Sequence, residues 1–184
     1  MPEPRRTRDI IREFAASDET VLTLQFDGTH ENVSDHWHAF LTDDRWNFVK
    51  KGIIITITRN MSSGRVKNWL LRRMGMKIGR KVFIASAVEL DIQFPELITI
   101  DDGAILGMHS HIATHEVTHT HIRLGKVHVG KNALIGGQAT VRSGVKIGDN
   151  SVVALRSFVT EDVPTNTLVT GMPARVTKPL HGSV

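Results

Sequence analysis

Aliphatic residues recur at every sixth position in three registers between positions 78 and 159, and small or β-branched residues usually follow four positions later. A period of six fits neither an α-helix nor an ordinary alternating strand. It predicts that each six-residue unit is a short strand followed by a tight turn. Three such units would form one coil of a triangular prism, and successive coils would stack through parallel hydrogen bonds. The aliphatic positions, expected to point inward, are Ile78, Ile84, Leu90, Ile100, Leu106, Ile112, Val129, Ile135, Val141, Ile147, Val153 and Val159. The second inward set is Val82, Val88, Ala104, Ser110, Ala133, Ala139, Val145, Ser151, Ser157 and Val163, with Phe94 and Glu116 as exceptions.

Two breaks in this count predict segments that leave the coils. After Leu90, four additional residues precede Ile100, and seventeen positions separate Ile112 from Val129. The second break predicts an external loop over about 115–126. Because a rigid scaffold holds such a loop in place, it is a common location for catalytic residues.

The first 76 residues do not show the six-residue repeat of aliphatic positions, and their pattern predicts a small α/β segment. Residues 5–16 predict an amphipathic helix, whereas TVLTLQF and GIIITITR predict strands. Residues 62–79 open with serines and predict a second helix that covers the open end of the coils. One side of this helix carries Val66, Trp69, Leu70 and Arg73.

The chain is therefore expected to comprise an N-terminal segment over 1–76, coils over 77–178 and a C-terminal tail over 179–184. The fold class is all-β, with the small α/β segment added at the N-terminus. The motif SDHWHAF, which contains His36, Trp37 and His38, is interpreted as core or interface packing.

Composition narrows the classes of function. The 184 residues include no cysteine, which excludes disulfides and thiolate metal sites. The net charge of +4 indicates at most an anionic ligand, and no nucleic-acid-binding motif accompanies it. No secretory signal or membrane-spanning run is evident, so the expected location is cytoplasmic.

Two stretches carry a resemblance to a known family: LIGGQATVRSGVKIGDNSVVALRSFVTEDVP and TGMPARV. They are similar to the closing coils of the hexapeptide-repeat acetyltransferases of the maltose, galactoside and nodulation type. The resemblance implies a left-handed parallel β-helix that assembles as a homotrimer. It also implies transfer of acetyl from acetyl-CoA to a hydroxyl group of a sugar or a related small acceptor.

Five of the ten histidines fall within HSHIATHEVTHTH, residues 109–121. His115 occupies the position of the family's catalytic histidine, and a nearly neutral imidazole can accept a hydroxyl proton as the oxygen attacks a thioester. Either Glu116 or Asp91 is a candidate carboxylate partner that fixes the imidazole tautomer. His109 and His111 are expected on one strand, pointing the same way, and with Asp91 they are candidates for acceptor binding.

The resemblance implies further site residues. The backbone N–H of Gly137 is the candidate oxyanion donor. The candidates that bind the cofactor are Gly136, Gly137, Leu155, Thr160, Arg175 and Lys178.

Two alternative functions remain open. The γ-class carbonic anhydrases resemble this fold and bind metal through histidines, but their pair separated by four residues is absent here, and we expect no metal. A non-catalytic scaffold is the other alternative, because Leu155, Arg156 and Glu161 depart from the family's pattern.

Overall fold

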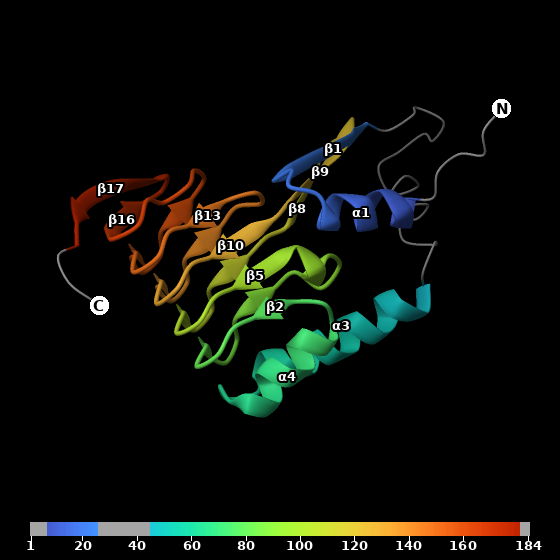
Figure 1. The fold of residues 1–184 in the computed structure, drawn as a ribbon, viewed down its shortest axis with the longest axis horizontal. Helices are drawn as coiled ribbons and strands as arrows, with labels where there is room; N and C mark the ends of the chain where they lie inside the picture. Colours follow the sequence, from blue (N-terminus) through green and yellow to red (C-terminus); the bar gives the residue numbers. More distant parts are fainter. Residues whose placement is uncertain (1–6, 26–44, 181–184) are drawn as a thin grey trace.

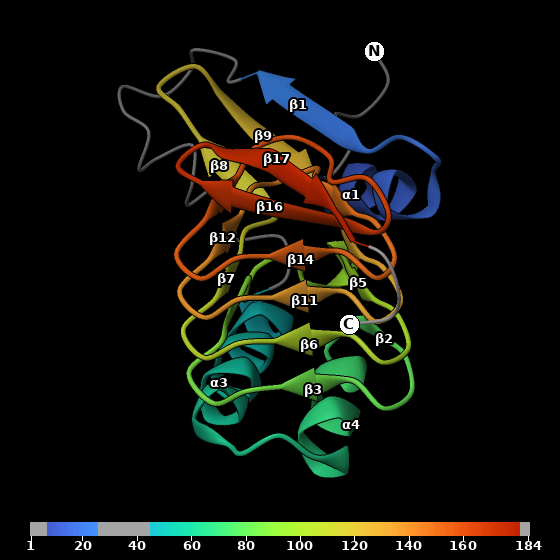
Figure 2. The ribbon, with the colours of Figure 1, turned by 90° about the vertical axis from the view of Figure 1, so that its left-hand side faces the viewer.

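A computed structural model describes residues 7–25 and 45–180. Short strands form three largely parallel sheets, and the helices lie at one end and along one side (Figures 1 and 2). The motif with His36, Trp37 and His38 lies outside the described residues.

Consecutive strands of the coils belong to the three sheets in turn, so each complete coil adds one strand to each sheet. The first sheet contains β2 (Lys77–Ile78), β5 (Ile98–Ile100), β10 (Val127–Val129) and β13 (Lys146–Ile147). The second contains β3 (Phe83–Ile84), β6 (Ile105–Leu106), β11 (Leu134–Ile135), β14 (Val152–Val153) and β16 (Thr167–Gly171), followed by the antiparallel β17 (Ala174–Pro179). The third contains β4 (Glu89–Leu90), β7 (His111–Ile112), β12 (Thr140–Val141) and β15 (Phe158–Val159).

The strand register confirms the inward positions predicted from the six-residue count. In the first sheet, for example, Ile100 pairs with both Ile78 and Val129. All twelve aliphatic positions are buried in one hydrophobic core, and all ten residues of the second inward set are buried as well. Burial of these side chains between the sheets supplies the main hydrophobic stabilisation of the coils.

Asparagines form a column at one set of turns. Asn132, Asn150 and Asn166 each have a positive φ, a conformation that asparagine tolerates better than most residues. The Asn132 side-chain amide donates to Asn150 Oδ1 at 3.3 Å, and that of Asn150 donates to Asn166 Oδ1 at 3.2 Å. The column therefore joins successive coils outside the strands.

The segment that interrupts the count between Ile112 and Val129 forms a β-hairpin. Its strands β8 (His115–Val117) and β9 (His121–Gly125) extend into an antiparallel sheet with β1 (Val21–Gln25), which confirms the strand predicted near residues 20–26. Helix α1 (Thr7–Ala16), also predicted, contributes Phe14 to a second core with Phe94, Leu97, Ile122 and Leu124. The short 3-10 helix η1 (Pro95–Leu97) lies in the other predicted break.

One element prediction was wrong. GIIITITR lies within helix α3 (Arg45–Asn60) and forms no strand. Ile55 and Thr58 are buried three residues apart, which is helical spacing. Packing of α3 against α4 and β4 thus overrides the strand propensity of its β-branched residues.

Helix α4 (Arg65–Arg73) confirms the predicted second helix beside the first coil, but its cap and its packed side differ from expectation. Gly64 is the N-cap, and Ser63 Oγ instead accepts a hydrogen bond from the Ile84 amide at 3.2 Å. The buried side consists of Lys67, Asn68 and Leu71, whereas Val66 and Trp69 are exposed. Within the described residues, no helix is both long and apolar enough to cross a membrane.

Candidate active site

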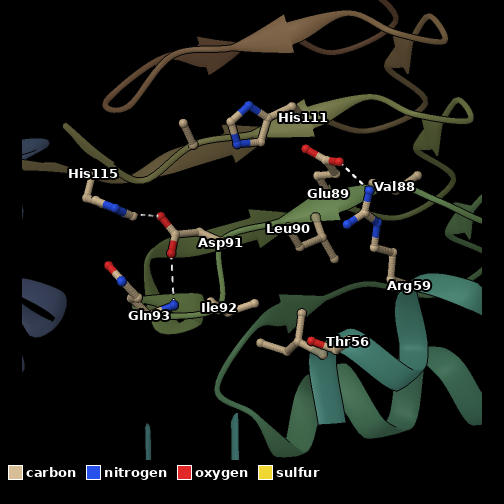
Figure 3. Close-up of a pocket in the computed structure, with 12 residues that line it drawn as sticks. Thr56, Arg59, Val88, Glu89, Leu90, Asp91, Ile92, Gln93, His111 and His115 are labelled. Atoms are coloured by element: carbon tan, nitrogen blue, oxygen red, sulfur yellow. Dashed lines mark hydrogen bonds and ion pairs between the residues drawn. The ribbon is translucent and has the colours of Figure 1, made fainter. Parts of the chain in front are cut away.

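His115 lies where the chain leaves the third sheet and enters the hairpin. Strands β4 and β7 are neighbours in that sheet, with Leu90 opposite Ile112, so the residues that follow each strand come close together. The Nδ1 atom of His115 lies 2.5 Å from Oδ2 of Asp91 (Figure 3). Of the two carboxylates considered from the sequence, Asp91 is therefore the one that contacts the imidazole.

Asp91 is fixed by several donors besides His115. Its Oδ2 accepts hydrogen bonds from the amide and the hydroxyl of Thr114, at 3.1 and 2.7 Å, and its Oδ1 accepts one from the Gln93 amide at 2.9 Å. Burial raises the pKa of Asp91, but hydrogen bonding to and the charge of His115, together with the Thr114 and Gln93 donors, outweigh burial and lower it to about 2. The carboxyl group is therefore ionised at neutral pH.

The ionised carboxylate determines which imidazole nitrogen carries a proton. A carboxylate can only accept hydrogen bonds, so Nδ1 of His115 is the donor to Asp91. In the neutral ring, Nε2 is then an acceptor. Phe94 also packs edge-on against the imidazole, with ring centroids 5.6 Å apart. The pair thus fixes the imidazole tautomer in which the proton is on Nδ1 and Nε2 can act as an acceptor.

A pocket of about 410 Å³ adjoins this pair (Figure 3). Helix α3 contributes Ile55, Thr56 and Arg59 to its lining, and strands β4 and β7 contribute Glu89 and His111. Arg59 forms an ion pair with Glu89, away from Asp91 and His115 in the view of Figure 3. The lining is therefore partly polar and carries both signs of charge.

Glu116 has a different role from the one considered beside Asp91. Its carboxylate accepts hydrogen bonds from Arg142 at 2.7 and 2.9 Å, from Arg123 at 2.8 Å and from Ser143 Oγ at 2.5 Å. Burial raises its pKa, but hydrogen bonds from Arg142 and Ser143 and the charges of both arginines lower it overall. Glu116 therefore links the hairpin to the next coil.

The two histidines considered for acceptor binding are separated by the structure. His111 is on β7 and lines the pocket, as does Asp91. The prediction that His109 shares this strand was wrong, because His109 is exposed in the preceding turn with φ +58°. His109 is not among the residues that line the pocket.

Within one chain, the backbone N–H of Gly137, which is the candidate oxyanion donor, does not lie close to His115. Gly137 precedes β12 by three residues, whereas His115 follows β7 by three. Since β7 and β12 are parallel neighbours, the two residues lie toward opposite ends of the third sheet, and the seven-residue offset corresponds to roughly 20 Å.

Both glycines at this turn have a structural reason for their small size. A Cβ on Gly136 would lie 2.6 Å from the Leu155 backbone nitrogen, and one on Gly137 would lie 3.0 Å from the Met108 carbonyl oxygen. Close packing of successive coils thus excludes a side chain at Gly136 and crowds one at Gly137.

The other residues predicted to bind the cofactor lie on the coils nearest the C-terminus. Leu155 is exposed in the turn between β14 and β15, and Thr160 directly follows β15. Arg175 and Lys178 are exposed on β17, where Arg175 lies 3.5 Å from Glu161. None of these four residues lines the pocket beside His115.

Sequence reasoning missed the contribution of α3 to the pocket. Thr56 and Arg59 were assigned to a strand, so nothing placed them near His115. Glu89 could have been found, because it occupies the outward position before Leu90 and pairs with His111. Within 7–25 and 45–180, no three histidine, aspartate or glutamate side chains form a group able to hold a metal ion.

Comparisons with known proteins agree with the strand arrangement. The model for the hexapeptide repeat of succinyl-transferase matches residues 126–155. The putative acetyltransferase YvoF of Bacillus subtilis (strain 168) is 38% identical over 141 residues, which cover 76% of this chain and 82% of that protein.

Two solved structures have a similar fold. A galactoside acetyltransferase in complex with coenzyme A has a TM-score of 0.64 and 18% identity, covering 97% of this chain and 92% of its own. A hexapeptide-repeat acetyltransferase from Vibrio cholerae O1 biovar eltor, complexed with acetyl-coenzyme A, has a TM-score of 0.60 and 22% identity, covering 77% and 91%.

The fold and these similarities define a transferase built on hexapeptide coils. The chain belongs to the hexapeptide-repeat acetyltransferase family. This membership confirms the predicted enzyme class, a CoA-dependent acyltransferase.

Proposed function

We propose that the protein transfers an acetyl group from acetyl-CoA to a hydroxyl group of a sugar or a related small acceptor, with His115 as the general base. The observation that carries this proposal is the Asp91–His115 pair beside a partly polar pocket. Acetyl-CoA supplies the acetyl group as a thioester.

His115 would hold the proton that the acceptor loses. Asp91 keeps the proton on Nδ1, so Nε2 can accept the hydroxyl proton as the oxygen attacks the thioester carbonyl. The charged imidazole that results is stabilised by the ionised Asp91. The same Nε2 can then return the proton to the departing thiolate.

The pocket supports a sugar-like acceptor. Arg59, Glu89 and His111 offer donors and acceptors along its wall, which suits a ligand rich in hydroxyl groups. The galactoside acetyltransferase with the similar fold is named for an acceptor of this chemistry. Asp91 and His111 are the predicted acceptor-binding residues that line this pocket.

The surface along the C-terminal coils fits an elongated donor. Met108, Leu155 and Met172 are exposed apolar side chains at turns that follow strands of the second sheet. They could contact an apolar arm, while Arg175 and Lys178 offer positive charge for phosphate groups. We place the donor along Gly136, Gly137, Leu155, Thr160, Arg175 and Lys178.

A homotrimer would complete the site. The Gly137 N–H and His115 lie roughly 20 Å apart in one chain by strand length, so the oxyanion donor would come from a neighbouring subunit. The outer face of the second sheet supports such contacts. Phe83 and Ile105 are exposed there beside the half-buried Leu134, whereas the matching positions of the first sheet include Lys77 and Lys146.

The proposal extends to the fold. We propose that the coils wind as a left-handed parallel β-helix over 77–178, preceded by the α/β segment 1–76 and followed by the tail 179–184. The rotation of the chain through three parallel sheets supports this architecture.

The experiment that tests the function is thiol release from acetyl-CoA, measured over a panel of sugars with wild type and His115→Ala. We expect turnover with at least one sugar and a loss of about 10²-fold or more in the variant. Absence of turnover with every acceptor, together with stoichiometric zinc, iron or cobalt in the protein, would overturn the proposal and favour a metal enzyme.

A further inference from the structure

Helix α3 is apolar on two sides, although the coils cover only one of them. Ile55 and Thr58 are buried, and Ile55 belongs to the core of the coils. A second row at spacings of three and four residues remains exposed: Trp46 at 87%, Val49 at 47%, Ile53 at 56% and Ile57 at 57%. A helix that is apolar on two sides normally has an apolar neighbour on each.

Helix α4 packs against α3 at the same end of the molecule (Figures 1 and 2), and it also has exposed apolar side chains. Its outward residues Val66 and Trp69 are 62% and 51% exposed. The Arg73 guanidinium lies over the Trp69 ring, 5.1 Å from the centroid. We call the exposed apolar residues of α3 and α4, namely Trp46, Val49, Ile53, Ile57, Val66 and Trp69, the helix-pair surface.

The charged side chains within residues 45–88, a range that includes both helices, are all of one sign. Residues 45–88 contain eleven lysines and arginines and no aspartate or glutamate. Some of these cations are already engaged, as Lys51 is with Glu96 and Arg59 with Glu89. Lys50 and Arg65, which stand on α3 and α4, are exposed.

We propose that the helix-pair surface binds an anionic phospholipid bilayer. Exposed helices with tryptophans and aliphatic residues among basic side chains suit the bilayer interface, where the apolar side chains enter the headgroup region and the cations attract anionic lipids. Tryptophan suits this boundary because its ring is largely apolar and its N–H is polar. The absence of acidic residues over 45–88 favours an anionic surface as the partner.

Binding there would bring the acceptor pocket close to the membrane. Ile55, Thr56 and Arg59 of α3 line the pocket, and Ile53 and Ile57 of the same two turns belong to the helix-pair surface. The helix is therefore shared between the two features. Acceptors carried at a lipid surface would then be held near His115.

The test is co-sedimentation of the full chain with vesicles of equal parts phosphatidylglycerol and phosphatidylcholine, and with vesicles of phosphatidylcholine alone. We expect binding to the anionic vesicles that weakens as salt is raised. Quenching of tryptophan fluorescence by brominated phosphatidylcholine, included in the anionic vesicles, reports insertion of the rings. No binding to anionic vesicles at low salt would overturn the proposal.

Paired variants locate the binding surface. Trp46→Ser with Ile57→Ser removes apolar contacts, and Lys50→Glu with Arg65→Glu reverses charge. Each pair is expected to weaken vesicle binding by about tenfold or more. The controls Val176→Ser and Lys131→Glu change exposed residues away from α3 and α4 and should bind within about twofold of wild type.

Two further outcomes would contradict the proposal. If both variant pairs bind vesicles as wild type does, another surface is responsible. If Trp46→Ser with Ile57→Ser lowers the assembly mass by light scattering, the surface is a contact between copies of the chain. Because neither vesicle binding nor mass depends on acetyl transfer, these results are separate from a failure of the proposed function.

Discussion

Two histidine–aspartate pairs in this protein have similar distances but different surroundings. His115 Nδ1 lies 2.5 Å from Asp91, and His128 Nε2 lies 2.7 Å from Asp101. The Asp91 side chain is 3% exposed, whereas that of Asp101 is 31% exposed. His128 is on β10 between Thr99 and Lys146 of the neighbouring strands.

The contrast shows what distinguishes the proposed catalytic pair beyond a short distance. Thr114 and Gln93 hold Asp91 in place, and the pKa of Asp91 is lowered to about 2, so its carboxylate stays charged and oriented. The pocket then adjoins the pair. His128 and Asp101 are more exposed, so solvent screens their interaction.

The largest expected difference concerns removal of each imidazole. His115→Ala should lower kcat/KM for acetyl transfer by about 10²- to 10⁴-fold, because the proposed general base is removed. His128→Ala, the matched control, should stay within about twofold, since it lies outside the pocket. Thiol release under saturating acetyl-CoA measures both. Equal losses in the two variants would show that activity does not distinguish the pairs.

Neutralising each carboxylate should give the next largest difference. Asp91→Asn should lower kcat by about 10- to 10²-fold, because the imidazole remains but its tautomer and orientation are no longer fixed. Asp101→Asn serves as control. A kcat of Asp91→Asn that matches wild type would contradict the positioning role.

Low pH should reduce the free energy of unfolding of wild type more than that of Asp91→Asn. The folded state lowers the pKa of Asp91 from 3.8 to about 2, so the unfolded state binds more protons between these values. The stabilisation is therefore present above about pH 4 and is lost as pH falls toward 2, with a magnitude of about 2 kcal/mol.

Urea unfolding at several pH values measures this loss. Wild type should lose about 2 kcal/mol more than Asp91→Asn between pH 4 and pH 2. Parallel curves for the two proteins would mean that the Asp91 carboxylate does not stabilise the folded state. Asp101→Asn again provides the comparison, because its carboxylate is partly exposed.

The smallest expected effect concerns the sequence neighbour of His115. Glu116→Gln should lower the free energy of unfolding by about 1 kcal/mol, because the arginines Arg142 and Arg123 lose the negative charge of their acceptor. Since Glu116 bonds to these residues and Asp91 holds the imidazole, the pH–rate profile should keep its wild-type shape. Denaturant unfolding and steady-state kinetics together test this, and a shifted profile would indicate an electrostatic effect on His115.

The coils could be predicted well from the sequence, because each six-residue unit contains its own inward-pointing residues. Ile135 and Ala139 are inward wherever the coil begins, and neighbouring coils repeat the pattern. The contact between Asp91 and His115 was harder to predict, because it depends on how residues beyond Leu90 and Ile112 turn after their strands pair. Asp91 was accordingly one of two candidate partners.

Helix α3 could not be predicted from local pattern. Its central residues Ile53, Ile54 and Ile55 favour strands by propensity, and the packing that makes them helical involves α4 and β4. Because of that error, the sequence did not predict that Arg59 lines the pocket. His109 was misplaced because a turn residue with positive φ follows β6, which an alternating strand pattern does not indicate.

The most direct test of His115 as the general base is rescue of His115→Ala by added imidazole. The account predicts that imidazole restores acetyl transfer in this variant saturably, with a rate that increases as the added base becomes neutral. The same addition should leave His128→Ala unchanged. Wild-type turnover by His115→Ala without imidazole would contradict the account and assign the base to another residue.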